Sequence, residues 1–297
     1  MRTTFNSQYR DLSAAIESAS DRLIDFQRQV ATGRRLNRPS DDPAAAATVV
    51  TERSRLGAIE QYAGAADSVG SRLAVADTVF SDIIDKLSAA RVAGMSVRGT
   101  EASDTQRAAV AQEVEGLRDA LVDDFNASFR GMYLFAGAAS ASAPYTVTGG
   151  TVGAYAGSAT EVEVDIGDDR AVTVGFNGEA LTQGSAAQDV FAFIDALVAG
   201  VEAGDSDAIG TALGGIEAAF TRVVAAQSRL GVDMQSVEAQ KLRLERMRLS
   251  ADERLGQLEG ANMTEAITNM QQADASYRAA LGAAAAATRL SLLDYLK

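Results

Sequence analysis

Apolar residues that recur alternately four and three positions apart over long proline-free stretches constrain this chain more than any other feature. The first such series comprises Leu12, Ile16, Ala19, Leu23, Phe26 and Val30. This spacing keeps a narrow apolar stripe on one helix face, as in helices that pack along a partner helix. The three prolines are Pro39, Pro43 and Pro144, so the strongest helix breaker is missing from most of the chain. The sequence therefore predicts long, paired helices.

The same periodicity predicts further helices along the chain. A second helix is expected from about Ala44 to Val97, which at 1.5 Å per residue makes it roughly 80 Å long. After a loop near residues 98–104, a third series over 110–125 is expected to fold back antiparallel on the second helix. Heptads resume near Val190 and strengthen over 223–258, although Lys241 interrupts them. The last series comprises Met263, Ile267, Met270, Ala273, Tyr277, Leu281 and Ala284, and it mirrors the first.

The middle of the chain changes from helical to alternating periodicity. Val162, Val164 and Ile166 alternate with three residues that carry carboxylates, Glu161, Glu163 and Asp165. After a turn at 167–170, Val172, Val174 and Phe176 alternate in the same way. Strict alternation is typical of a half-buried strand, so these residues predict a two-sided β-hairpin with one solvated face.

Together the patterns predict a mainly α fold, an elongated antiparallel helical bundle or coiled coil formed by the N- and C-terminal segments, with a small β-rich insertion in the middle. Residues 1–40 are expected to form a terminal helix that pairs with residues 262–297. Residues 41–137 and 188–261 would form a helical rod, and residues 138–187 a β-rich outer domain too small for a large core of its own.

Composition excludes several functions. With 40 acidic and 27 basic residues the net charge is -13, which argues against a nucleic-acid partner. The chain contains no cysteine and no histidine, so the commonest metal ligands and the commonest general base are missing. We therefore expect no enzymatic activity, no catalytic residue, no cofactor and no metal site. The segment from Met1 to Gln8 lacks the apolar core of a signal peptide, and no run predicts membrane insertion.

The segment ATGRRLNRPSDDP, residues 31–43, has the chemistry of a helix stop followed by a helix start. Gly33 suits a left-handed C-cap, Ser40 and Asp41 suit an N-cap, and Pro43 suits the first helical turn. The adjacent Asp41 and Asp42 favour the positive end of a helix dipole, which explains them better than catalysis does. The arginines at positions 28, 34, 35 and 38 form a basic patch that could contact acidic neighbours or simply line a solvated turn.

The segment GMYLFAG marks the start of the β-rich region. Tyr133, Leu134 and Phe135 are expected to be core residues, and Gly131 and Gly137 are expected to permit the turns on either side.

These two segments, the opening MRTTFNSQY and the tail YRAALGAAAAATRLSLLDYL together resemble the FlgL type of flagellar hook-associated protein, within the flagellin superfamily. The resemblance spans nearly the whole chain. The family pattern S-T-G-K-R-x-N-x-P-S-D-D-P is matched at Gly33, Arg35, Pro39, Ser40, Asp41, Asp42 and Pro43. Ala31 and Arg34 depart from that pattern, and Asn37 is one position out of register.

The resemblance implies a structural subunit that joins the hook of a bacterial flagellum to its filament and assembles through its terminal helices. It implies the following assembly-interface residues: Leu12, Ile16, Leu23, Phe26, Val30, Ile267, Met270, Tyr277, Leu281, Leu292, Leu293 and Tyr295. The implied partners are copies of itself in a ring, the first hook-associated protein, flagellin and a cytosolic export chaperone. Its implied place is extracellular, after type III export without a cleaved signal peptide.

Two other functions remain open from the sequence. Flagellin shares the same organisation of terminal helices, although the opening MRTTFNSQY and the ending SLLDYLK favour the junction protein. A secreted coiled-coil binding module, in which the β insertion contacts a surface, is a second alternative, and the motifs at both ends of the chain argue against it.

Overall fold

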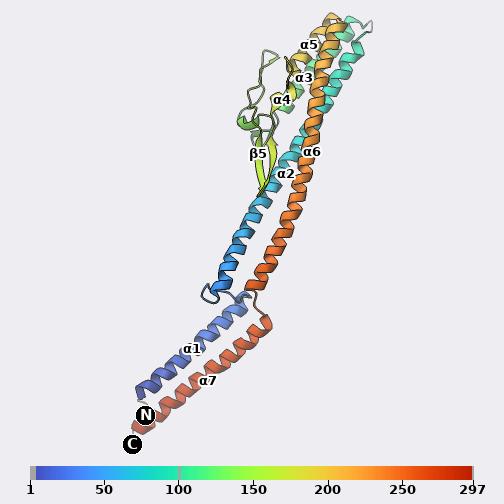
Figure 1. Ribbon diagram of the computed structural model, residues 1–297. Coiled ribbons are helices and arrows are strands. Elements are labelled where there is room, and N and C mark those ends of the chain that lie inside the picture. Colours follow the sequence, from blue (N-terminus) through green and yellow to red (C-terminus); the bar gives the residue numbers. More distant parts are fainter. Residues whose placement is uncertain (1–4, 100–101, 296–297) are drawn as a thin grey trace. The chain divides into compact units, whose positions relative to one another are not determined.

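The computed structural model describes residues 5–99 and 102–295, with side chains described for residues 10–99 and 102–286. The chain divides into two compact units. The terminal unit comprises residues 1–59 and 246–297, and the central unit comprises residues 60–245. The fold is mainly α, with small antiparallel sheets in the middle of the sequence, as predicted (Figure 1).

The described helices are α1 (Phe5–Thr32), α2 (Pro43–Val97), α3 (Asp104–Phe125), α4 (Gly178–Thr182), α5 (Val190–Ala203), α6 (Ser206–Glu259) and α7 (Met263–Tyr295), with a short 3-10 turn at Gly137–Ala139. The strands pair as β1 (Ser128–Phe129) with β2 (Met132–Tyr133), β3 (Val147–Thr148) with β4 (Thr151–Val152), and β5 (Val162–Gly167) with β6 (Arg170–Gly175). The predicted second and third helices and the predicted hairpin are therefore present.

Helix ends in the central unit follow local capping chemistry. Ser103 and Gln106 form a reciprocal capping box at the start of α3, with the Ser103 amide donating to Gln106 Oε1 at 3.0 Å. Gly204 adopts a left-handed φ of 68° and ends α5, and Asp205 then caps α6. The periodicity over 190–258 did not predict this break, because apolar spacing continues on both sides of it.

Aromatic side chains form the core of the central unit. Edge-to-face contacts link rings whose centroids lie 5.0 to 5.8 Å apart, and these rings belong to Phe80, Phe125, Phe135, Tyr145, Phe176 and Phe191. Phe80 comes from α2, Phe125 from α3 and Phe191 from α5. Phe135, Tyr145 and Phe176 come from the segment between α3 and α5 that carries strands β1 to β6, which we call the β-rich region. The β-rich region therefore shares one core with the helices around it.

The β5–β6 hairpin is fastened to two helices by side-chain hydrogen bonds to its backbone. Arg72 of α2, which is only 8% exposed, donates from Nε to the Val174 carbonyl at 2.6 Å. On the other side, Gln240 of α6 donates to the Ile166 carbonyl at 3.1 Å. The hairpin thereby links α2 to α6 within the central unit.

Among the described helices, α6 has the length and composition that could cross a membrane. A core helix passes the same test, and Ile209, Ile216 and Val223 of α6 are buried within the central unit.

Replacing Arg72 with alanine is predicted to destabilise the central unit by about 2–3 kcal/mol, because the buried Val174 carbonyl would lose its charged donor and the long side chain would leave a void. Urea unfolding followed by circular dichroism measures the change. Arg243→Ala, at an exposed position of α6, serves as the control and should change stability by less than about 0.5 kcal/mol. Equal free energies of unfolding for the two variants would show that the Arg72–Val174 hydrogen bond does not stabilise the central unit.

Candidate assembly interface

The terminal helices α1 and α7 lie side by side and run antiparallel (Figure 1). The predicted stripe of α1 faces α7, but each of its six members, Leu12, Ile16, Ala19, Leu23, Phe26 and Val30, is only half-buried. Of the α1 side chains that the structure describes, residues 10–32, none is fully buried. Fully burying a large apolar side chain contributes about 1.5–3 kcal/mol, so each of these residues realises only part of that stabilisation.

The α7 residues predicted as one stripe lie on two faces. The side towards α1 carries Ala266 and Ala273, which are buried, with Met270 and Tyr277 half-buried beside them. Met263, Ile267 and Leu281 are instead 40%, 40% and 43% exposed. They are separated by four and fourteen residues, so helical geometry places them along one line beside the α1 contact. We call Met263, Ile267 and Leu281 the outer stripe.

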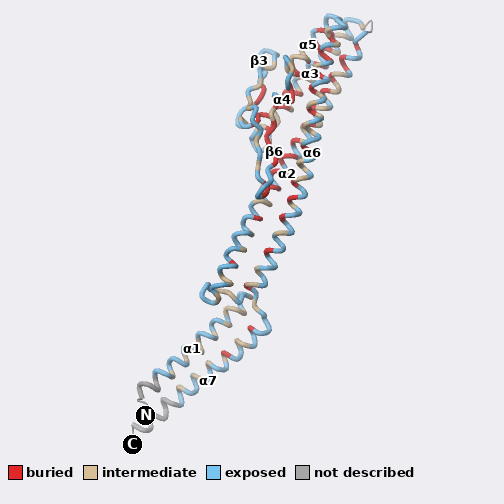
Figure 2. The backbone as a smooth tube through the Cα atoms, in the orientation of Figure 1, coloured by how far each residue is buried: buried red, intermediate tan, exposed pale blue. Residues whose placement is uncertain are grey.

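Small residues leave the helix pair incompletely filled. An open groove of about 490 Å³ runs between α1 and α7 and is lined by Ala15, Ser18, Ala19, Arg22, Phe26, Asn269, Gln272, Ala273 and Ser276. Interiors of folded domains leave few voids larger than a water molecule, so this pair is packed more loosely than a core. Figure 2 shows the contrast: buried residues concentrate on the central-unit elements, whereas α1 and α7 are mostly half-buried or exposed. The predicted interface residues Leu292, Leu293 and Tyr295 belong to α7, and their side chains lie outside those that the structure describes.

Beyond α1 and α7, the two connectors of the terminal unit pair through their backbones. The Arg35 amide donates to the Glu259 carbonyl at 2.6 Å, and the Ala261 amide donates to the Gly33 carbonyl at 3.0 Å. These bonds form a short antiparallel bridge between the α1–α2 connector and the α6–α7 connector. Four helix ends are thereby held together, so the helix stop predicted at Gly33, with φ of 68°, also serves a long-range contact.

Glu259 lies at the centre of this junction. Its side chain is only 8% exposed, and its two carboxylate oxygens lie 3.4 Å from Arg34 Nε and 2.7 Å from Arg53 Nη2. The Arg53 contact is an ion pair without the geometry of a directed hydrogen bond. Arg35 donates to the Leu258 carbonyl at 3.2 Å and pairs with Asp42 at 3.7 Å. The arginine patch predicted from sequence therefore meets acidic groups of its own chain.

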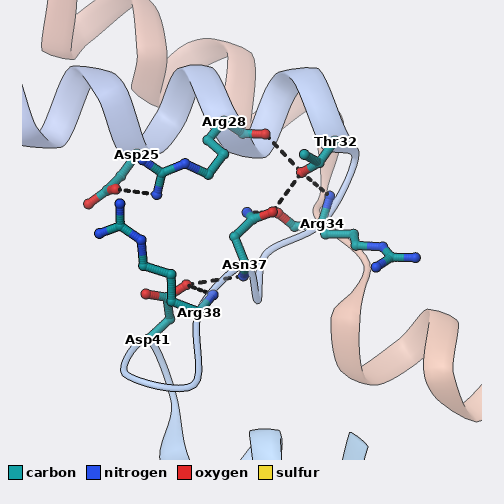
Figure 3. A network of polar contacts seen from close by, with 7 residues as sticks. All are labelled: Asp25, Arg28, Thr32, Arg34, Asn37, Arg38 and Asp41. Atoms are coloured by element: carbon teal, nitrogen blue, oxygen red, sulfur yellow. Dashed lines mark hydrogen bonds and ion pairs between the residues drawn. The ribbon is translucent and has the colours of Figure 1, made fainter. Parts of the chain in front are cut away.

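The loop before α2 is closed by polar side chains (Figure 3). Asp41 Oδ2 accepts from the amides of Asn37 at 3.1 Å and Arg38 at 2.8 Å. Asn37 in turn donates from Nδ2 to the Arg34 carbonyl at 2.8 Å, and its Oδ1 lies 3.0 Å from the Thr32 hydroxyl. The hydrogen bond from the Arg38 amide, helped by the one from Asn37 and by nearby arginines, lowers the pKa of Asp41.

The expectation that Ser40 or Asp41 caps α2 was wrong. Asp42 is the cap, because its Oδ1 accepts from the Ala45 amide at 3.1 Å and Pro43 is the first helical residue. Asp41 is turned towards the preceding loop, where its carboxylate satisfies two amides. Two adjacent aspartates therefore serve two different backbone turns.

In the segment GMYLFAG of the central unit, two of the three expected core residues are fully buried. Leu134 and Phe135 are fully buried and Tyr133 is half-buried. Gly131 and Gly137 adopt φ values of 81° and 55°, and a side chain at position 137 would collide with the Ser158 carbonyl. Among the described residues, no group of His, Cys, Asp or Glu is arranged to hold a metal ion.

Two family models match the chain. The bacterial flagellin N-terminal helical region matches residues 4–140, and the bacterial flagellin C-terminal helical region matches residues 213–296. The chain is 24% identical over 262 residues to flagellar hook-associated protein 3 of Escherichia coli, covering 80% of this chain and 82% of that protein. It is 27% identical over 180 residues to flagellar hook-associated protein 3 of Salmonella typhimurium, covering 60% of this chain and 56% of that protein.

Solved structures share the fold. The crystal structure of FlgL from Xanthomonas campestris superposes with a TM-score of 0.63 at 18% identity and covers 69% of this chain and 99% of its own. FlgL from Bacillus cereus superposes with a TM-score of 0.59 at 18% identity and covers the same shares of the two chains.

Replacing Glu259 with glutamine keeps the side-chain shape but removes the charge that two arginines share. We expect the Arg35 and Ala261 amides to exchange with solvent about tenfold faster, which corresponds to about 1.4 kcal/mol of lost local stability. Hydrogen exchange followed by mass spectrometry measures this rate. The control is Glu253→Gln on the exposed face of α6, and exchange rates indistinguishable between the two variants would contradict a role for the Glu259 ion pairs.

Proposed function

Because this chain belongs to the flagellin superfamily and is a hook-associated protein of the FlgL type, we propose that it is the junction subunit between hook and filament of the bacterial flagellum. The names of its curated relatives favour the junction protein over flagellin and over a secreted binding module. The proposed role is structural, without an active site, a metal or a cofactor.

One observation carries the assembly part of this proposal. The terminal helices pair through a stripe that stays half-buried, and the outer stripe of α7 remains exposed beside it. Ordering a backbone costs about 1–2 kcal/mol per residue. Apolar surface that remains exposed to water does not offset this cost, and long helices with a narrow interface bury little apolar surface. Contact with the terminal helices of neighbouring copies would bury that surface and fill the groove between α1 and α7.

The proposed organisation assigns assembly to residues 1–40 and 262–297, which would pack with copies of themselves in a ring. Residues 41–137 and 188–261 would form the rod, and residues 138–187 would cover the outer surface. We further propose that the first hook-associated protein binds on one side of the ring and flagellin on the other. Before assembly, a cytosolic chaperone would hold the subunit for type III export. We propose no binding to nucleic acid and no insertion into a membrane.

A deletion strain complemented with stripe variants tests the function and the interface together. Loss of the gene should leave hooks intact while flagellin monomers leak into the medium, and the wild-type gene should restore filaments. The double variant Ile267→Ser with Leu281→Ser should leave flagellin leaking at close to the deletion level, because it removes two exposed apolar contacts from the outer stripe. Immunoblots of flagellin in the medium and electron microscopy of hooks measure the result.

The control is Val92→Ser with Met95→Ser, which removes two apolar side chains of α2 in the central unit that are more exposed than Ile267 and Leu281. These residues are 64% and 61% exposed, and their replacement should restore filaments as well as the wild-type gene does. Normal filaments with the outer-stripe variant would exclude that stripe from assembly. A deletion strain that leaks no flagellin would reject the junction role itself.

A further inference from the structure

Charge is distributed very unevenly between the two units. The terminal unit contains 15 basic and 13 acidic residues, a net charge of +2. The central unit contains 12 basic and 27 acidic residues, a net charge of -15, which together with the terminal unit gives the -13 of the whole chain. The part of the chain that we propose to self-associate is thus nearly neutral, and the rest is strongly acidic.

Three arginines of the central unit connect its elements by hydrogen bonds, and their charges are already included in the net charge of -15. Arg72 and Arg222 donate to backbone carbonyls, those of Val174 and Leu181 among them. Burial lowers the pKa of both guanidinium groups, which nevertheless stay protonated far above neutral pH. Arg170 donates to the Ser236 hydroxyl. These arginines fasten the β-rich region to the helices.

The carboxylates of the central unit crowd one another. Glu163 and Asp165 lie on the exposed face of β5, and Glu161, just before the strand, is exposed as well. The turn that follows β5 adds two more exposed aspartates at 168 and 169. Burial raises the pKa of Asp233 on α6, and the neighbouring Glu163 carboxylate raises it further. Like charges therefore already oppose one another within a single copy.

We propose that repulsion between the acidic central units of neighbouring copies opposes the self-association of the near-neutral terminal units, so that ionic strength controls assembly of this chain. The inference rests on the proposed assembly through α1 and α7, and the partner concerned is a second copy of the same chain. The central unit of each added copy brings another charge of -15 to the assembly, whereas the apolar contacts between terminal helices add no charge repulsion.

Salt separates the two contributions. The Debye length is about 30 Å at 0.01 M salt and about 3 Å at 1 M, so repulsion between exposed carboxylates acts across neighbouring copies only in dilute salt. Apolar contact persists at both concentrations. Assembly should therefore strengthen as sodium chloride is added, and removing exposed carboxylates should have the same effect without salt.

The test compares the purified full-length chain with the triple variant Glu161→Gln, Glu163→Gln, Asp165→Asn. Sedimentation velocity and negative-stain electron microscopy give the concentration at which half of the chains are assembled, at about 0.01 M and about 1 M sodium chloride. We expect the triple variant to assemble at a concentration lower by about threefold or more than wild type at low salt, and equally with wild type at high salt. Circular dichroism checks that both proteins are folded.

The charge-preserving variant Glu161→Asp, Glu163→Asp, Asp165→Glu is the matched control, and it should assemble as wild type does at both salt concentrations. If wild type assembles equally at the two concentrations and the neutral variant matches it, repulsion does not control assembly, although the proposed function stands. If none of the three proteins assembles at either concentration, the proposed self-association fails and the inference fails with it. Assembly that weakens with added salt would also overturn the inference, because it would indicate attraction between opposite charges.

Discussion

An apolar stripe one side chain wide is the constraint on which this structure depends. Two helices that share such a stripe can exclude water along one line only, and alanine at positions 266 and 273 makes that line thin. The consequence is visible at Leu12, Leu23 and Phe26, which stay half-buried although they face the partner helix. Because hydrophobic stabilisation grows with the apolar area removed from water, this helix pair has much to gain from further contacts.

In the central unit, by contrast, the apolar side chains of the helices are buried within a single chain. Its helices contribute one face each to an aromatic core, and a β-hairpin completes that core from outside. Side chains of Arg72 and Gln240 reach from two helices to the hairpin backbone, so the long helices are joined through it as well as directly. The central and terminal units are thus built from the same kind of long helix. They differ in the width of the face that each helix buries, which is broad in the central unit and narrow in the α1–α7 pair.

Local signals in the sequence predicted the end of α1, the start of α2 and the hairpin, whereas α4 and the break between α5 and α6 were not predicted. Gly33 and Pro43 predicted where α1 ends and α2 begins, because backbone conformation at these residues is decided by the residue itself. The role of Glu259 could not be predicted, since its partners Arg34 and Arg53 lie more than two hundred residues away in the sequence. The sequence predicted one apolar stripe on α7 where the structure has two faces, for a similar reason. Alanine fits either face, and only the position of α1 decides which face is buried. The residues assigned to contacts between copies remain a prediction.

The central claim is that α1 and α7 reach full stability only when copies of the chain assemble. Hydrogen exchange of the full-length protein, before and after assembly, tests this most directly because it measures the local opening of each helix. We expect amides of α1 and α7 to exchange at least about tenfold more slowly after assembly, while amides around the aromatic core of the central unit change little. Amides of α1 and α7 as strongly protected in the free chain as in the assembly would contradict the claim.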